Sequence, residues 1–140
     1  IDMLDAVFKS VARPFWGKKI FQDAAAVYQE SCIAFNQSVK KDINMRTMEV
    51  PCAGGFLLTE DTTENGLGEL FEIGKEIVTY QNVEDAIEKV HYYLDHEEER
   101  EAIALAGHQR VMKEHTYQHR VNTMLELATR YGLIPEAVHA

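Results

Sequence analysis

The apolar residues of the first part of the chain recur at helical spacing. In the opening segment they stand three or four positions apart: Leu4, Val7, Phe8 and Val11. This pattern predicts an amphipathic helix with Asp2 as its N-cap. Pro14 and Gly17 interrupt the pattern, and a second helical pattern follows over residues 21–31. We expect residues 1–31 to form a helical segment that leads into a sheet.

Short apolar runs alternate with helical patterns in the middle of the chain. Three runs have the length and composition of buried strands: 32–36, 55–59 and 76–80. A short helix is expected before the second run, despite Pro51, and a helical turn before the third. Strands that alternate with helices form right-handed βαβ units, so the predicted fold class is α/β with a Rossmann-like parallel sheet. Three strands make about half of a doubly wound sheet, and we expect further strands in a missing N-terminal portion.

The pattern of the last part of the chain is helical. One helix, starting after Asn82 as N-cap, carries apolar residues on one face: Val83, Ala86, Ile87, Val90 and Leu94. Two further helices are predicted in a C-terminal segment, 97–140. The first begins with the acidic run at Glu97, which suits a helix N-terminus, and the second stops at Gly132. The α/β core is therefore expected to occupy residues 32–96.

Composition and charge limit the partners that the chain is expected to have. It has 140 residues, 46% of them apolar, and a formal net charge of −9, as in an ordinary acidic globular domain. Duplex binding relies on clustered Lys and Arg, so we expect no nucleic acid as a partner. No apolar stretch has the length of a membrane span. Cys32 and Cys52 lie in apolar runs without zinc-ligand spacing, which predicts buried free thiols in a reducing, cytoplasmic setting.

The segment that follows the first predicted strand contains the main candidate for a binding site. In open α/β sheets, ligands bind beyond the carboxyl ends of the strands, where helix N-termini offer N–H groups to anions. The helix start at 44–46 is such a place, and Glu49 offers a carboxylate to a vicinal diol such as a ribose. Gly54 and Gly55 would bring backbone close to a ligand, or a helix close to a strand. The alternatives are helix capping for the glycines and an exposed helix former for Glu49.

A basic cluster lies beside this segment in an otherwise acidic chain. It consists of Lys40, Lys41 and Arg46. An anionic ligand at this cluster is electrostatically reasonable, and the alternative is a solvated lysine pair.

Two histidines of the C-terminal segment, His115 and His119, stand four residues apart and would share a helix face. A metal site there lacks an evident third ligand. A capping or interdomain role is therefore favoured, and no metal is expected.

Three stretches carry a resemblance to a known family. In chain order they are DINMRTMEVPCAGGFLLTED, ELFEIGKEIVTY and EHTYQHR, within a register that covers most of the chain. Together they resemble the C-terminal part of GT-B glycosyltransferases of the group with a spore-maturation CgeB-type domain. The resemblance implies a Rossmann-like, nucleotide-sugar-binding domain of a two-domain enzyme, whose donor substrate is a nucleotide-diphosphate sugar and which needs no metal or other cofactor.

The same resemblance implies roles for particular residues. Glu49 matches the acid that holds the nucleotide ribose, and the backbone of Asn44, Met45 and Arg46 lies where the diphosphate or the transferred sugar sits. The Arg46 side chain would add positive charge near the phosphates. Gly54 and Gly55 belong to the same stretch and are expected at the site.

One position departs from the pattern of related retaining enzymes. They carry a second Glu eight positions before the one that matches Glu49, and here that position is Lys41, with Asp42 beside it. Lys41 and Asp42 are therefore counted with the donor site. Lys41 in place of an acid also favours the alternative of a non-catalytic binding or structural module.

The expected function is transfer of a sugar from a nucleotide-diphosphate sugar to an unknown acceptor. The alternatives are the non-catalytic module and a sugar-nucleotide epimerase. In the resembled architecture the last helix crosses toward the N-terminal domain. We therefore expect apolar side chains to be exposed on this helix, which would contact either that missing domain or a second copy of the chain.

Overall fold

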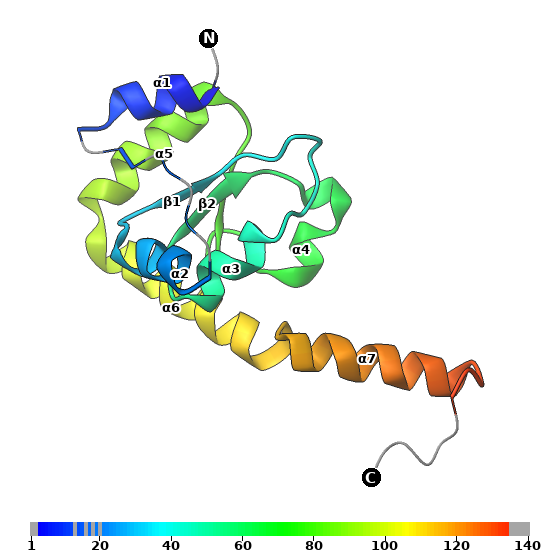
Figure 1. The fold of residues 1–140 in the computed structure, drawn as a ribbon. Coiled ribbons are helices and arrows are strands. Elements are labelled where there is room, and N and C mark those ends of the chain that lie inside the picture. Colours follow the sequence, from blue (N-terminus) through cyan, green and yellow to red (C-terminus); the bar gives the residue numbers. More distant parts are fainter. Residues whose placement is uncertain (1–2, 13, 16, 18, 20, 135–140) are drawn as a thin grey trace.

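The computed structural model describes residues 3–12, 14, 15, 17, 19 and 21–134, and Figure 1 shows helices packed around a small central sheet. The helices are α1 (Met3–Ser10), α2 (Phe21–Glu30), α3 (Arg46–Cys52), α4 (Leu67–Leu70), α5 (Val83–Asp95), α6 (Glu97–Glu114) and α7 (Tyr117–Arg130). The strands are β1 (Ala34–Asn36), β2 (Leu57–Glu60) and β3 (Val78–Tyr80), and a short 3-10 helix covers Thr63–Asn65. The predicted helices and strands are thus present, although Asp2, the expected N-cap of the first helix, lies outside the described residues.

The sheet is parallel and its strands are arranged in chain order, β1-β2-β3. Ala34 pairs with Leu57, and Leu58 pairs with Val78. Helical structure follows each strand, and between β1 and β2 and between β2 and β3 it forms the crossover connection that parallel strands need. The predicted α/β class with a parallel, Rossmann-like sheet is confirmed.

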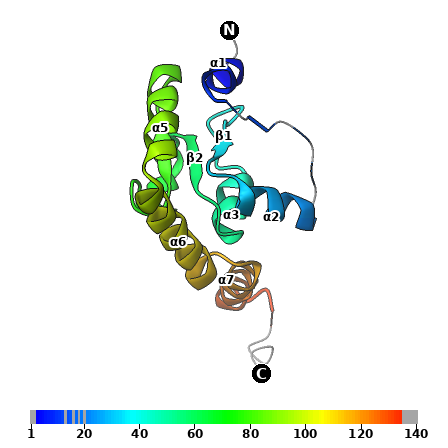
Figure 2. The ribbon, with the colours of Figure 1, turned by 90° about the vertical axis from the view of Figure 1, so that its left-hand side faces the viewer.

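Both faces of the sheet are covered, which gives the domain two apolar cores (Figure 2). Consecutive residues of β2 point to opposite faces: Leu58 packs with residues of α1 and α5, and Leu57 packs with residues of α3 and α4. Helix α6 contributes Ile103 to the first core and Val111 to the second. The sequence of a central parallel strand is a continuous apolar run because both of its faces are buried, and such a run predicted β2.

Helix α5 shows one confirmed prediction and one that is wrong. The Asn82 side chain accepts a hydrogen bond from the N–H of Asp85 at 2.9 Å, so Asn82 is the N-cap. Leu94, however, is 40% exposed, and its predicted place on the buried face is taken by Tyr93. The Tyr93 ring packs on Phe56 with a centroid distance of 4.7 Å. Tyr93 lies seven residues after Ala86 and three after Val90, so these three share the buried face. Leu94 lies seven residues after the partly buried Ile87, at the margin of that face.

Both cysteines are exposed free thiols, so the prediction of buried thiols is wrong. Cys32 lies in the connection before β1, which begins only at Ala34. Cys52 is the last residue of α3, and its neighbour Pro51 takes the buried position there. Apolar neighbours in the sequence therefore did not predict the exposure of Cys32 and Cys52, which lie at the ends of their apolar runs.

The two C-terminal helices differ in how they pack. Helix α6 begins with Glu97, Glu98 and Glu99 in its first turn, as predicted, and crosses both cores. Helix α7 contains no buried residue and projects from the body of the domain (Figure 1). It ends before Gly132, which has a positive φ of 68°. Within the described residues no helix is both long and apolar enough to cross a bilayer.

Candidate functional site

The carboxyl ends of the three strands meet at one edge of the sheet, where Asn36, Glu60 and Tyr80 are the last strand residues. The connection from β1 to α3, residues 37–45, crosses this edge. Parallel strands bind ligands beyond their carboxyl ends because the following helices start there and leave unpaired N–H groups. This edge is called the carboxyl edge below, and the opposite one the amino edge.

A buried asparagine organises the carboxyl edge. Asn36 is 1% exposed, and its Nδ2 donates to Thr59 Oγ1 on the neighbouring strand at 3.0 Å. It also exchanges two hydrogen bonds of 3.2 Å with the amide of Asn44, one in each direction. Arg46 Nη1 donates to Asn36 Oδ1 at 3.4 Å. The start of α3 is therefore tied by side chains to the end of β1, and a buried amide with satisfied hydrogen bonds holds it in one orientation.

The same strand end is tied to β3 by a buried phenol. Tyr80 Oη donates to the backbone carbonyl of Asn36 at 2.9 Å, and the Tyr80 ring stacks on Phe35 with centroids 4.9 Å apart. Burial, with a smaller effect from Glu60, raises the pKa of Tyr80 well above its ordinary value. The hydroxyl therefore stays protonated at neutral pH and acts as a donor within the structure rather than as an acid or base.

The loop between β1 and α3 is held by its own side chains. Ser38 Oγ donates to Asp42 Oδ1 at 2.5 Å and accepts from the Asp42 N–H at 2.7 Å. The hydroxyl of Ser38 lowers the pKa of Asp42, so this carboxyl is ionised at neutral pH. Lys41 has a φ of 54°, an unusual left-handed conformation for a residue other than glycine, and its carbonyl accepts a hydrogen bond from Asn65 Nδ2. Such conformations persist where the surrounding structure imposes them.

Charged side chains on this loop and on α3 remain open to solvent. Within the described part of the chain, Lys40, Lys41 and Glu49 form no ion pair, and the Glu49 carboxylate accepts no hydrogen bond. Glu49 lies three residues after Arg46, so both are on one side of the helix, and they are not paired with each other. The N–H groups of Met45 and Arg46 also donate to no described residue. The carboxyl edge thus combines free N–H groups, basic side chains and an uncommitted acid.

The structure places Gly54 and Gly55 at the amino edge, away from 44–46, because α3 runs from one edge of the sheet to the other. Gly54 follows the C-cap of α3 with a φ of 83°, and its N–H donates to the Pro51 carbonyl at 2.9 Å. A Cβ on Gly55 would lie 2.7 Å from the carbonyl oxygen of Tyr28 in α2. The structure thus shows the close approach of a helix at Gly55 and, at Gly54, the helix termination that was the alternative interpretation.

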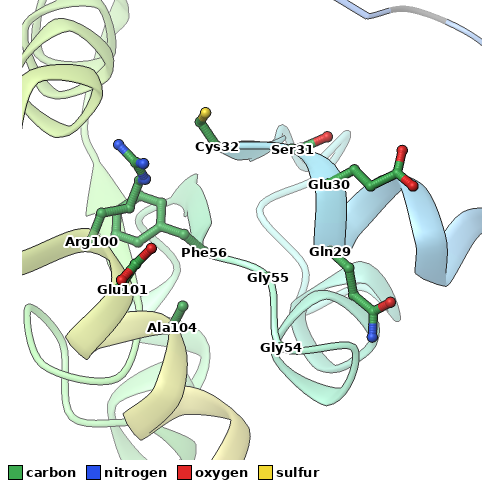
Figure 3. A pocket seen from close by; sticks show the side chains of 10 residues that line it. All are labelled: Gln29, Glu30, Ser31, Cys32, Gly54, Gly55, Phe56, Arg100, Glu101 and Ala104. Carbon is green, nitrogen blue, oxygen red and sulfur yellow. The ribbon is translucent and has the colours of Figure 1, made fainter. Parts of the chain in front are cut away.

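A cavity of about 260 Å³ lies beside these glycines at the amino edge (Figure 3). Among the described residues that line it, Arg100 alone is cationic, and its guanidinium already donates hydrogen bonds within the fold. Arg100 Nη1 donates to the Tyr93 carbonyl at 2.6 Å and to the Leu94 carbonyl at 3.4 Å, closing the C-terminus of α5. Glu30 and Glu101 add negative charge to the rim. The amino-edge cavity is therefore a poor receptor for phosphate.

The two histidines noted in the sequence serve the junction of α6 and α7. His119 and Thr116 form a capping box, in which His119 Nδ1 accepts from the Thr116 N–H at 3.3 Å. His115 Nε2 lies 3.0 Å from the Leu70 carbonyl, at the end of α4. A capping role for His119 is confirmed. In the described part of the chain, no three His, Cys, Asp or Glu side chains come together in a way that could hold a metal ion.

Comparison with known families adds an independent observation to this geometry. A family model described as glycosyl transferase-like matches residues 4–126, most of the chain. The chain belongs to this family. No curated protein and no solved structure matches it significantly. The family supports a group 1 glycosyltransferase-type domain, and the three-stranded parallel sheet is consistent with part of the Rossmann-like domain of a GT-B enzyme.

In this glycosyl transferase-like domain, the sequence-predicted residues fall into two groups. The carboxyl edge brings together Lys41, Asp42, Asn44, Met45, Arg46 and Glu49, whereas the glycines stand at the other end of α3. Sequence reasoning missed the residues that arrange the carboxyl edge, namely Asn36, Ser38, Thr59 and Tyr80. A polar residue at the end of an apolar strand run was the available signal for Asn36. Its partners lie up to 44 residues away in sequence, so their pairing was not visible.

Proposed function

We propose that this domain binds a nucleotide-diphosphate sugar at the carboxyl edge of its sheet and takes part in transfer of the sugar to an acceptor. The observation that carries the proposal is the uncommitted Glu49 carboxylate on α3, beside an ordered helix start in a glycosyl transferase-like chain. A group that is exposed, charged and unpaired next to an elaborate hydrogen-bond network is available for a ligand.

Each group at this edge has a distinct proposed role. The two Glu49 oxygens accept hydrogen bonds from the two ribose hydroxyls. The N–H groups of Met45 and Arg46, with the Arg46 guanidinium, face the diphosphate. Lys41 and Asp42 lie on the side of the sugar. Binding of the diphosphate here also stabilises the negative charge that develops on it as the sugar departs, which is the main contribution of a protein to such a transfer.

A non-catalytic binding module is the second candidate. It is favoured by Lys41, which stands where related retaining enzymes carry an acid, and whose side chain is exposed. This module would bind the nucleotide without transferring the sugar. An epimerase would instead isomerise the free nucleotide sugar without an acceptor, so product analysis in the absence of acceptor separates it from a transferase.

Calorimetric titration with UDP, GDP and ADP and with their monophosphates tests the proposed site. We expect one diphosphate to bind at least about tenfold more tightly than its monophosphate, because the second phosphate adds charge-assisted hydrogen bonds. Equal affinity for each pair, or no binding by a folded sample, would contradict the proposal.

The variant Glu49→Gln tests whether the nucleotide binds at the carboxyl edge. Replacing the carboxylate with a neutral amide removes charge-assisted hydrogen bonds worth about 1.5–3 kcal/mol, so affinity for the preferred diphosphate should fall at least about tenfold. The melting temperature should barely change, because the carboxylate has no partner in the described structure. Glu98→Gln is the matched control, since Glu98 is an exposed acid in the first turn of α6 and should leave affinity unchanged. Unchanged affinity with a clear loss of stability in Glu49→Gln would refute the ribose assignment.

A further inference from the structure

The exposed apolar residues of α7 and its C-cap follow a heptad spacing. They stand four, three, four and three positions apart: Tyr117, Val121, Met124, Ala128 and Tyr131. This is the alternating spacing of the a and d positions along one seam of a coiled coil. Four of the five are well exposed, with exposed fractions of 78% for Tyr117, 47% for Val121, 61% for Met124 and 73% for Tyr131. Leu127, beside the seam, is 44% exposed.

The described chain does not cover this seam. Helix α7 has no buried residue and extends beyond the sheet and α6 (Figures 1 and 2). Isolated helices of about 12–15 residues are marginal in water, and the capping box at Thr116 stabilises only the first turn. A 14-residue helix with one continuous apolar seam gains its stability by packing that seam against another surface.

We propose that α7 pairs with α7 of a second copy of this chain, in an antiparallel contact whose two-fold axis passes near Met124. In this arrangement Met124 meets its own counterpart, and Tyr117 of each copy lies beside Tyr131 of the other. A two-fold contact of this kind uses the same patch on both copies and therefore closes without leaving a free seam. The alternation of large and small residues along the seam allows the two helices to interdigitate.

Charge decides the relative direction of the two helices. Each copy has a formal net charge of −9. A parallel pair would place the two acidic bodies side by side at one end of the helices. An antiparallel pair separates them by the length of α7, about 21 Å for its 14 residues, which exceeds the screening length of about 8 Å at physiological salt. The antiparallel pair also aligns the two helix dipoles favourably.

The exposed apolar area is sufficient for a weak dimer. A tyrosine presents on the order of 200 Å², so the two tyrosines at about three-quarters exposure contribute roughly 300 Å² per copy. The half-exposed Val121, Met124 and Leu127 raise this to on the order of 500 Å² per copy. The pair would then bury on the order of 1,000 Å², the lower limit for a specific interface. We therefore expect a dimer that forms in the micromolar range and dissociates on dilution.

Sedimentation velocity across the micromolar range tests the dimer. The wild-type chain should change from monomer to dimer as concentration rises. Met124→Glu places two carboxylates together at the two-fold axis and should weaken dimerisation at least about tenfold. Met112→Glu is the matched control, because Met112 is a half-exposed methionine on α6, outside the seam, and it should dimerise like the wild type. Equal melting temperatures and helical circular dichroism at monomer concentrations would verify that the variants are folded.

Cross-linking tests the direction of the helices. With Cys32 and Cys52 replaced by serine, an equimolar mixture of Tyr117→Cys and Tyr131→Cys chains should form mixed disulfide dimers, whereas Tyr117→Cys chains alone should not. Efficient cross-linking of Tyr117→Cys chains alone would overturn the antiparallel arrangement. A wild-type chain that stays monomeric at the highest concentration, or a Met124→Glu variant that dimerises normally, would overturn the pairing itself.

Discussion

The two ends of α3 show how differently one short helix is used at the two edges of the sheet. At the amino edge the polar groups are bonded within the fold: Arg100 closes α5, and His108 Nδ1 lies 3.1 Å from the Pro51 carbonyl at the end of α3. Gly55 stands there because the backbone carbonyl of Tyr28 is too close for a side chain, and Gly54 because its φ is positive. At the carboxyl edge a buried network lies beside charged side chains that pair with no residue the structure describes, above all Glu49.

Residues that serve packing and residues that are available for binding thus lie at opposite ends of one short stretch, 44–55. Polar groups that are satisfied internally contribute stability and leave nothing for a ligand. Groups that are held in place but left unpaired contribute little stability and remain available for recognition. We therefore expect substitutions at the amino edge to change stability alone, and substitutions in the Asn36 network to change both stability and binding. Substitution of an unpaired charged group of the carboxyl edge, such as Glu49, should change binding alone.

The largest effect is expected from Gly107→Ala, on the amino-edge side. Helix propensity alone predicts a gain of about 1 kcal/mol for this change within α6. A Cβ at position 107, however, would lie 2.3 Å from the backbone carbonyl oxygen of Glu76, which cannot move without displacing the start of β3. We expect a net loss of about 2–3 kcal/mol in the free energy of unfolding, measured by urea denaturation, with nucleotide affinity unchanged.

Gly68→Ala in α4 is the matched control for this prediction. A Cβ there meets Thr63 only at 4.0 Å, so the propensity gain should appear as a small increase in stability. If both alanine variants are more stable than the wild type, the close approach of α6 to Glu76 is not the reason why position 107 is a glycine.

The next effect in size is expected from Asn36→Ala, within the network of the carboxyl edge. The change leaves Thr59 and Asn44 without their buried partner, at a cost of about 1–3 kcal/mol in unfolding free energy. It also releases Asn44 and Arg46 at the start of α3, so affinity for the preferred nucleoside diphosphate should fall too. Asn122→Ala, at an exposed position of α7, should alter neither quantity. A destabilised Asn36→Ala variant with full affinity would show that the network does not position the ligand site.

The smallest effect is expected from Ser38→Ala, measured by NMR titration of the carboxyl groups. The Ser38 hydroxyl lowers the pKa of Asp42, so its removal should raise that pKa toward the ordinary value of 3.8. Because the folded-state pKa lies below the unfolded one, the stabilisation by this carboxylate is present above pH 3.8 and is lost as the pH falls through the folded-state pKa. Asp61, whose pKa is lowered mainly by the backbone N–H of Thr63, is the internal control and should not shift. An unchanged Asp42 titration would mean that the Ser38 contact does not stabilise the ionised form.

Much of the fold was predictable because its signals are local. The run before Thr59 is apolar and continuous, as in a strand buried on both faces, and Asn82 stands directly before a helical pattern that it caps. Where burial depends on an exact position within an element, local signals failed. Cys32 precedes its strand, and Leu94 lies just past the contact that Tyr93 makes with Phe56.

The candidate site was predictable to a smaller extent. The acid Glu49 and the helix start that precedes it were recognisable from residue types and from family resemblance. The separation of Gly54 and Gly55 from that helix start was not, because it depends on the direction in which α3 crosses the sheet. The role of Asn36 depends on contacts with Thr59 and Tyr80, which belong to other strands.

The sequence by itself determined the order of helices and strands, the parallel sheet and the apolar seam of α7, since each follows from the spacing of residues that are close in the chain. Only the tertiary structure decided which polar groups are satisfied and which are left free. The approach of Tyr28 to Gly55, the pairing of Asn36 with Asn44 and the exposure of Glu49 depend on elements that meet after long connections. Hydrogen bonds and steric contacts act over a few ångströms, so they depend on this three-dimensional proximity and not on position along the chain.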